Sequence, residues 1–204
     1  MCSSDLPDLV TYGCAMRVIA GEARGRVLRA PAGTATRPTA DRVRGAVFNM
    51  LGSQLDLDGA VVLDLFAGSG ALGIEALSRG AAAAVFVEDA AAARRVVTEN
   101  LAATGLGDRA VVRAGDATSP RVLAEVAVVA PDGSFDVAFC DPPYRFDGWA
   151  GLLEVLPARW SVLESDREIA LPGPWEVVRI KRYGSTVVSL ARRDRPGGWR
   201  AEQE

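Results

Sequence analysis

The sequence predicts an α/β protein whose sheet is mostly parallel and ends in an antiparallel hairpin. After residue 60, short stretches rich in β-branched residues alternate with stretches of helical period, which is typical of parallel strands joined by helices. The last stretch, WEVVRIKRYGSTVVSLARR, alternates on both sides of Tyr183-Gly184-Ser185 and predicts a β-hairpin with its turn there. The sheet is therefore expected to be mixed.

The elements of this domain, residues 56–204, follow in order along the chain. Strands are predicted at 61–65, 84–87, 110–113 and 135–140, with a further strand near Val162 or Ile169. Helices are predicted between them, at about 70–79, 89–103, 118–129 and 147–158.

Residues 16–55 differ in character and are expected to form an N-terminal extension of the α/β domain. VIAGEARGRVL indicates a small basic hairpin, ATRPT a loop, and DRVRGAVFNML a helix with Asp41 at its N-terminus. That helix carries one apolar stripe for docking on the sheet domain, made of Val43, Val47, Met50 and Leu51. Residues 1–15 are expected to be a disordered or extraneous extension, because they lack the pattern of a secretory signal.

Composition excludes several classes of site. The net charge of −3 argues against a protein that coats nucleic acid, yet the stretch from Met16 to Met50 carries seven arginines against two acids. The absence of histidine excludes Ser-His-Asp and Cys-His catalysis, and the three cysteines have the spacing of neither a zinc site nor a disulfide framework. We expect no metal, no membrane span and a reducing, cytoplasmic setting.

A glycine-rich loop follows the first predicted strand. In VVLDLFAGSGALGIEAL, Gly68, Gly70 and Gly73 match the G-x-G-x-x-G spacing, which alone is a weak signal for a dinucleotide. Asp64 lies just before the loop, where a carboxylate would repel a pyrophosphate but attract a cation or an amino group. The loop residues expected to contact a cofactor are Phe66, Ala67, Gly68, Ser69 and Gly70.

Further acids end the following strands. Glu88, at the end of VFVE, could hold ribose hydroxyls, and this pair of acids suits an adenosyl group with a positive sulfonium and an amino-acid tail better than NAD. Asp116 in VVRAGDA could accept a hydrogen bond from an adenine amine beside the Ala117 N–H, although a role in capping the next helix is equally favoured. These acids are expected to meet at the carboxyl edge of the sheet.

The stretch FDVAFCDPPY ends a predicted strand in Asp141, Pro142, Pro143 and Tyr144. The two prolines remove backbone donors and leave carbonyls beside the Asp141 carboxylate, a rigid pair of acceptors for an exocyclic amine. Such acceptors could orient the lone pair of the amine towards a methyl donor, and Tyr144 could stack on a base flipped out of its helix. A simple strand terminator is the alternative.

These motifs resemble a known family. LDLFAGSGALGIEAL, VFVE and FCDPPY are similar to the binding and catalytic motifs of class I S-adenosylmethionine-dependent methyltransferases that act on amino nitrogens. MRVIAGEARGRVL and RPTADRVRGAVFNML resemble, more narrowly, the RsmD family of bacterial 16S ribosomal RNA guanine-N2 methyltransferases. The resemblance extends from Met16 to about Arg193; the pair Asp89-Ala90 departs from relatives, which often place an acid one position later.

The resemblance implies a Rossmann-like, seven-stranded sheet and methyl transfer from S-adenosylmethionine to N2 of one guanine, position 966, in the 16S rRNA of the 30S subunit. It implies catalysis by the DPPY residues, cofactor contacts that include Asp89, and an RNA-contacting N-terminal extension. The residues expected to bind RNA are Arg24, Arg26, Arg37, Thr39, Arg42 and Arg44. A monomer is expected.

Three alternatives remain open from the sequence. The DPPY motif is shared by adenine and guanine amine methyltransferases, so an adenine-N6 methyltransferase acting on DNA or RNA is one. A catalytically silent ribosome-assembly factor is the second, and an NAD-dependent oxidoreductase is a weaker third, disfavoured by Asp64 and by the lack of histidine.

Overall fold

The computed structural model describes residues 16–31, 38–143 and 145–193, and the side chains of 38–41 are not part of that description. The predictions for residues 1–15, Arg37 and Tyr144, and for the side chain of Thr39, therefore lie outside the described residues.

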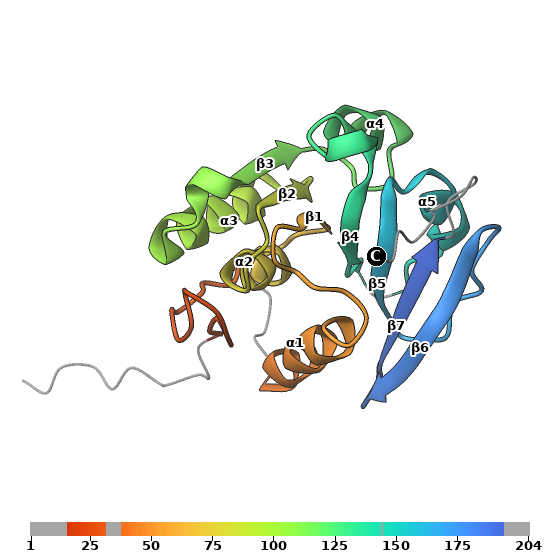
Figure 1. The fold of residues 1–204 in the computed structure, drawn as a ribbon, viewed down its shortest axis with the longest axis horizontal. Coiled ribbons are helices and arrows are strands. Elements are labelled where there is room, and N and C mark those ends of the chain that lie inside the picture. Colours follow the sequence, from red (N-terminus) through yellow and green to blue (C-terminus); the bar gives the residue numbers. More distant parts are fainter. Residues whose placement is uncertain (1–15, 32–37, 144, 194–204) are drawn as a thin grey trace, which may run out of the picture.

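The sheet has seven strands in the order β3-β2-β1-β4-β5-β7-β6 (Figure 1). The strands are β1 (Val61–Leu65), β2 (Ala83–Glu88), β3 (Ala110–Ala114), β4 (Phe135–Cys140), β5 (Ala158–Ser165), β6 (Trp175–Tyr183) and β7 (Thr186–Arg193). The first five are mutually parallel, whereas β7 runs antiparallel to both β5 and β6. The mixed, Rossmann-like sheet and its C-terminal hairpin are thus confirmed.

The strand order reverses between β1 and β4, and this reversal fixes where a ligand can enter. In open α/β sheets the crevice lies outside the carboxyl ends of the strands at such a switch point. The residues that follow β1 and β4, the glycine loop and Asp141, are therefore brought to the same place.

Helices cover both faces of the sheet (Figure 1). They are α1 (Pro38–Leu51), α2 (Ala71–Ser78), α3 (Ala91–Thr104), α4 (Pro120–Ala127) and α5 (Trp149–Val155), with short 3-10 turns at Gly107–Arg109 and Pro131–Gly133. Buried side chains of α1, α2 and α3 share one core with Val62, Phe86 and Phe139. Those of α4 and α5 pack on the other face, because alternate strand residues point to opposite sides.

The predicted extension, residues 16–55, shares that first core rather than forming one of its own. Val43, Val47, Met50 and Leu51, the predicted stripe of α1, are all buried there. The N-terminal hairpin is present as an isolated antiparallel bridge between Arg17 and Val27 rather than as two strands. The extension is thus built onto the face that α2 and α3 cover.

Two helix boundaries differ from prediction by three residues, and the position of the fifth strand is decided between its two alternatives. Helix α1 begins at Pro38, so Asp41 is its fourth residue and not its N-terminus; proline suits a first turn, where its missing N–H has no helical partner. Helix α5 ends at Val155, because Pro157 follows and β5 already begins at Ala158. Ile169 lies in a loop and packs against the second core, so the fifth strand contains Val162.

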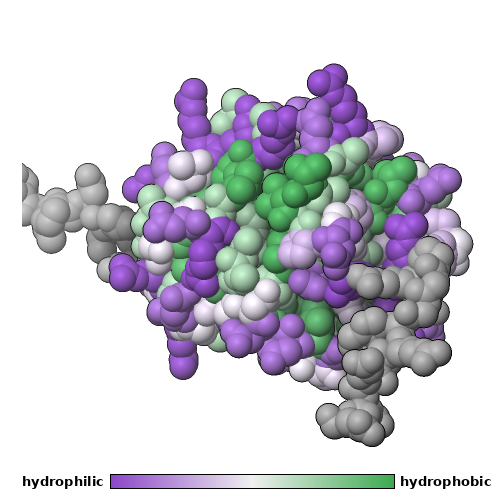
Figure 2. All heavy atoms as spheres, turned by 45° about the horizontal axis from the view of Figure 1, so that its top comes forward, coloured by the Kyte–Doolittle hydropathy of each residue, from purple (hydrophilic) through white to green (hydrophobic). Residues whose placement is uncertain are grey.

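The surface mixes apolar and hydrophilic residues. On the face in Figure 2, green apolar side chains are interrupted by purple hydrophilic ones. The most exposed large apolar residue among those described is Val128, just after α4, at 82%. Within the described ranges, no helix combines the length and the apolar character that crossing a membrane requires.

Candidate active site

The glycine loop after β1 requires its glycines for two different reasons. Phe66, Gly68 and Gly70 adopt positive φ values of 58°, 55° and 76°, a conformation that glycine enters without a Cβ clash. Gly73, in the first turn of α2, lies so close to β2 that a Cβ would sit 2.3 Å from a ring carbon of Phe86. The loop is therefore pressed against the sheet, with its backbone facing the crevice.

Asp64 lies beneath this loop and is almost fully buried, at 2% exposure. Its Oδ2 accepts a hydrogen bond from the Gly73 N–H at 2.8 Å. The pKa of Asp64 is raised to about 8, chiefly by burial and also by the nearby charges of Asp141 and Glu88, while the hydrogen bond from Gly73 acts in the opposite direction. A cation or amino group in the crevice would favour the charged form of this acid.

Glu88, at the end of β2, stabilises the glycine loop through hydrogen bonds. Its two carboxylate oxygens accept hydrogen bonds at 2.8 Å, one from the Gly68 N–H and one from the Ala90 N–H. Each oxygen keeps a second lone pair, so the group can still accept a ligand hydroxyl. Asp89, next to it, is exposed, and its backbone carbonyl accepts from Arg94.

Asp116 and Ala117 lie after β3, two strands away from β1. Asp116 is exposed and accepts hydrogen bonds from the N–H and the hydroxyl of Thr118, at 2.8 and 2.7 Å, and Ala117 is buried. The alternative that Asp116 caps the next helix is wrong, because Ser119 is the N-cap of α4 and accepts from the Val122 N–H.

A cavity of about 270 Å³ opens at the switch point. Its walls join the end of β1 and the glycine loop to the ends of β4 and β5 and to the N-terminal extension. The lining residues are Met16, Ala30, Pro31, Arg44, Asp64, Phe66, Ala67, Gly68, Ser69, Ala71, Leu72, Asp141 and Glu164. The cavity thus contains five of the predicted cofactor residues and Asp141; Gly70, Glu88, Asp89, Asp116 and Ala117 do not line it.

Asp141, directly after β4, presents its carboxylate to this cavity, and two prolines follow it. The Pro143 carbonyl accepts from the Phe146 N–H at 3.2 Å, whereas no group in the described ranges donates to the Pro142 carbonyl. Asp141 opens to the cavity, yet the protein around it withdraws enough water to raise its pKa to about 6. At neutral pH Asp141 is therefore mostly ionised and able to accept from an amine.

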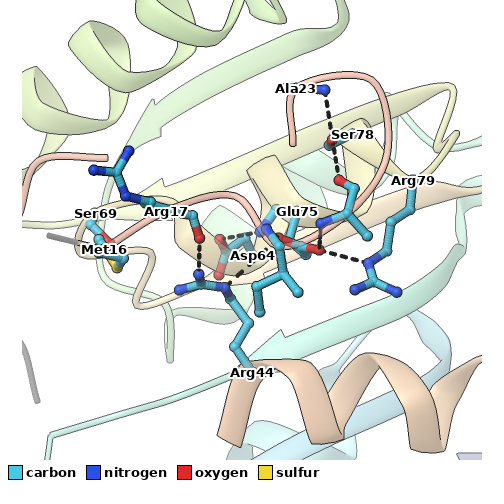
Figure 3. A network of polar contacts seen from close by, with 12 residues as sticks. Met16, Arg17, Ala23, Arg44, Asp64, Ser69, Glu75, Ser78 and Arg79 are labelled. Atoms are coloured by element: carbon cyan, nitrogen blue, oxygen red, sulfur yellow. Dashed lines mark hydrogen bonds and ion pairs between the residues drawn. The ribbon is translucent and has the colours of Figure 1, made fainter. Parts of the chain in front are cut away.

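The N-terminal hairpin is held over the site by buried polar groups that the sequence did not reveal (Figure 3). Glu75 of α2 is fully buried; its oxygens accept from the backbone N–H groups of Ile19 and Ala20 at 2.7 and 3.0 Å and from Arg79 Nε at 2.7 Å. The Ser78 hydroxyl donates to the Ala20 carbonyl at 2.6 Å.

Asn100 of α3 makes a second connection. Its amide Nδ2 donates to the Ser69 carbonyl at 2.8 Å and to the Arg29 carbonyl at 2.9 Å, and its Oδ1 accepts from the Arg29 N–H at 2.8 Å. One side chain therefore couples the extension to the glycine loop.

The prediction that Arg44 is an RNA-binding residue is wrong, because its side chain is 4% exposed. Arg44 Nη2 donates to the Arg17 carbonyl, and Nε lies 3.9 Å from a Glu75 oxygen (Figure 3). A cation buried in this way belongs to the cavity wall and is not presented to an RNA surface. By contrast, Arg24, Arg26 and Arg42 are exposed.

Comparisons with known proteins identify the family of the chain. The family described as "Conserved hypothetical protein 95" matches residues 16–192. Ribosomal RNA small subunit methyltransferase D of Escherichia coli (strain K12) is 35% identical over 193 residues, which is 89% of this chain and 92% of that protein. YlbH of Bacillus subtilis (strain 168) is 41% identical, over 86% of this chain and 97% of YlbH.

A solved structure agrees as well. The structure of yhhF from Escherichia coli superposes with a TM-score of 0.73 at 34% identity, covering 88% of this chain and 98% of that one. The span that the family matches, residues 16–192, contains the hairpin, the glycine loop, the DPP segment and the seven strands except Arg193, the last residue of β7. The chain therefore belongs to the RsmD family, the methyltransferase family of these relatives.

Proposed function

We propose that this chain transfers a methyl group from S-adenosylmethionine to the exocyclic N2 of a guanine in the RNA of the small ribosomal subunit, at position 966 by family resemblance. The observation that carries the proposal is that the Asp141 carboxylate lines the same cavity as Asp64 and the glycine loop. The carbonyl of the following Pro142 accepts no hydrogen bond from the described residues. The proposed setting is the cytoplasm, with a monomer acting on the assembled or assembling 30S subunit.

The residues of the crevice fit the cofactor. Gly68 allows the backbone to approach a ligand, and Phe66 and Leu72 give the cavity an apolar wall. Glu88 lies outside the cavity lining, where it accepts from the Gly68 N–H, and it retains lone pairs for ribose hydroxyls. Asp64 is a buried acid whose charged form a cationic tail would stabilise. When bound, S-adenosylmethionine supplies an electrophilic methyl group whose C–S bond breaks with its electrons retained by sulfur.

Asp141 and Pro142 act on the amine. The lone pair of a guanine amine is delocalised into the ring, so the amine is a poor nucleophile until it is oriented. Hydrogen bonds from both N–H groups to the Asp141 carboxylate and the Pro142 carbonyl direct that lone pair towards the methyl group. As the N–C bond forms, the amine loses a proton to Asp141, whose pKa of about 6 suits a base at neutral pH.

The exposed arginines of the extension position the RNA. Arg24 and Arg26 lie on the hairpin and Arg42 on α1, the two elements that Glu75 and Arg44 help to join to the sheet domain. Arginines at such positions hold phosphates without selecting a base. The cavity then selects the nucleotide, which must leave its stack to reach Asp141.

The test is methyl transfer by Asp141→Ala into small subunits from cells that lack this protein. The expected result is a fall in rate of about a hundredfold or more with little change in S-adenosylmethionine affinity, because Asp141 contacts the base and not the cofactor. Asp147→Ala, at a surface residue paired with Arg167, is the matched control and should keep its rate. A near-normal rate for Asp141→Ala would contradict the proposal.

A further inference from the structure

Glu164 is the one acid of the cavity that has no role in the proposed transfer. It lies near the end of β5, and the parallel register pairs Cys140 with Leu163, so Asp141, directly after β4, comes next to Glu164. Because side chains alternate along a strand, both share the face of Phe139 and Val162, the face covered by α1 and α2. Both line the cavity.

The Glu164 carboxyl is half-buried. Within the ranges that the structure describes, neither it nor the Asp141 carboxyl takes part in a hydrogen bond or ion pair, although Arg44 is near enough to favour the charged form of Glu164. Polar groups withdrawn from water are normally hydrogen-bonded, so the half-buried Glu164 carboxyl, open to the cavity beside the exposed Asp141, points to a ligand that bonds to it.

We propose that Glu164 recognises the base-pairing edge of the target, its carboxyl accepting the N1–H of a guanine whose N2 amine lies against Asp141. The inference rests on the proposed function. In guanine, N1–H and the N2 amine are adjacent donors, so two neighbouring acceptor groups match them. An adenine held by its N6 amine would instead turn its N1 lone pair and C2–H towards Glu164, so at least one carboxyl oxygen would be left without a partner.

The protonation of Glu164 strengthens this match. Desolvation, together with the charges of Asp141 and Asp64, raises its pKa to about 8, and Arg44 opposes the shift. A carboxyl that keeps its proton at neutral pH can accept from N1–H with one oxygen and donate to O6 with the other. Guanine is the base that offers this donor beside this acceptor.

The test uses two kinds of small-subunit particle, reassembled with either guanine or 2-aminopurine at the methylated position. 2-Aminopurine keeps the N2 amine but lacks O6 and N1–H. Wild type should prefer guanine by about tenfold or more, since 2-aminopurine leaves the Glu164 carboxyl without its partners O6 and N1–H. Glu164→Leu should reduce that preference to less than about threefold, with Glu164→Ala as a second apolar variant should leucine disturb folding.

Glu164→Gln separates recognition from a structural role. A glutamine amide can accept from N1–H and donate to O6, so this variant should keep both the guanine rate and the preference. A glutamate needed only as the counter-ion of Arg44 would not be replaced by a neutral amide. Glu168→Gln, at an exposed residue paired with Arg182, is the matched control.

The outcomes are distinct. The proposal is overturned if both apolar variants retain the wild-type preference for guanine. It is also overturned if Glu164→Gln loses that preference to the same extent as the apolar variants. A wild-type protein that methylates neither kind of particle would instead overturn the proposed function. Cofactor affinity, measured by calorimetry for each variant, should stay unchanged.

Discussion

Asp64 should make the binding of S-adenosylmethionine depend on pH. Its pKa of about 8 means that roughly one tenth of the protein carries a charged Asp64 at pH 7 and about one hundredth at pH 6. If the bound cofactor requires the carboxylate, ionising Asp64 costs about 1.4 kcal/mol at pH 7 and about 2.7 kcal/mol at pH 6. The dissociation constant should then fall about tenfold from pH 6 to pH 7.

Affinity for the cofactor should rise with pH because the pKa of Asp64 is raised. An acid whose pKa is raised holds its proton below that pKa, so the charged, binding-competent form is gained as pH rises towards about 8. The cofactor's own amino group keeps its proton between pH 6 and 7, because the pKa of an α-amino group is about 7.7 to 8.0. The window from pH 6 to pH 7 therefore separates the protein acids from the cofactor amine, and the Asp64 and Asp141 variants distinguish between the two acids.

Calorimetric titration at pH 6.0, 6.5 and 7.0 measures this dependence, and Asp64→Asn is the variant that should lose it. The asparagine oxygen can still accept from the Gly73 N–H, so the loop should keep its shape while the charge is removed. Asp141→Asn should keep the dependence of the wild type. Equal affinity at pH 6 and pH 7 in the wild type, or the same slope in Asp64→Asn, would refute the reasoning.

Three further outcomes are expected. Gly73→Ala should lower the free energy of unfolding by about 1 to 3 kcal/mol in urea titrations, because its Cβ would lie 2.3 Å from an aromatic ring carbon, whereas Gly151→Ala, with nothing within 4 Å, should not destabilise. Glu75→Gln should lower the free energy of unfolding by about 3 kcal/mol, since it removes a fully buried charge from its partners Arg44 and Arg79. It should also speed amide hydrogen exchange across residues 17–26, and unchanged exchange would show that Glu75 does not hold the hairpin. Arg24→Ala combined with Arg26→Ala should weaken RNA binding and reduce the slope of log K against log salt by about 0.7 to 0.9 per arginine, and an unchanged slope would exclude phosphate contact.

The first four strands were predictable because each combines a short apolar run with a following acid or glycine turn. β1 and β4 are examples, since Asp64 and Asp141 mark the carboxyl edge in the sequence itself. Helix ends were less predictable. Helix α1 begins at Pro38, which lies in the ATRPT stretch predicted as a loop, and α5 ends before Pro157.

The missed site residues depend on tertiary packing. Glu164, in VLES, looks like an ordinary polar strand end, and only the register of β4 against β5 places it beside Asp141. Arg44 did carry a local signal, because Phe48 and Leu51 lie four and seven positions later on the same helical face, and both are buried. The burial of Glu75 could not be foreseen, since it requires the hairpin to pack on α2.

The central claim is tested most directly by identifying the methylated nucleoside. Purified protein is incubated with labelled S-adenosylmethionine and small subunits from cells that lack it, and the RNA is digested and separated by chromatography. The account predicts one labelled product, N2-methylguanosine, formed at a single site and lost with Asp141→Ala. Label in N6-methyladenosine, or no incorporation, would contradict it.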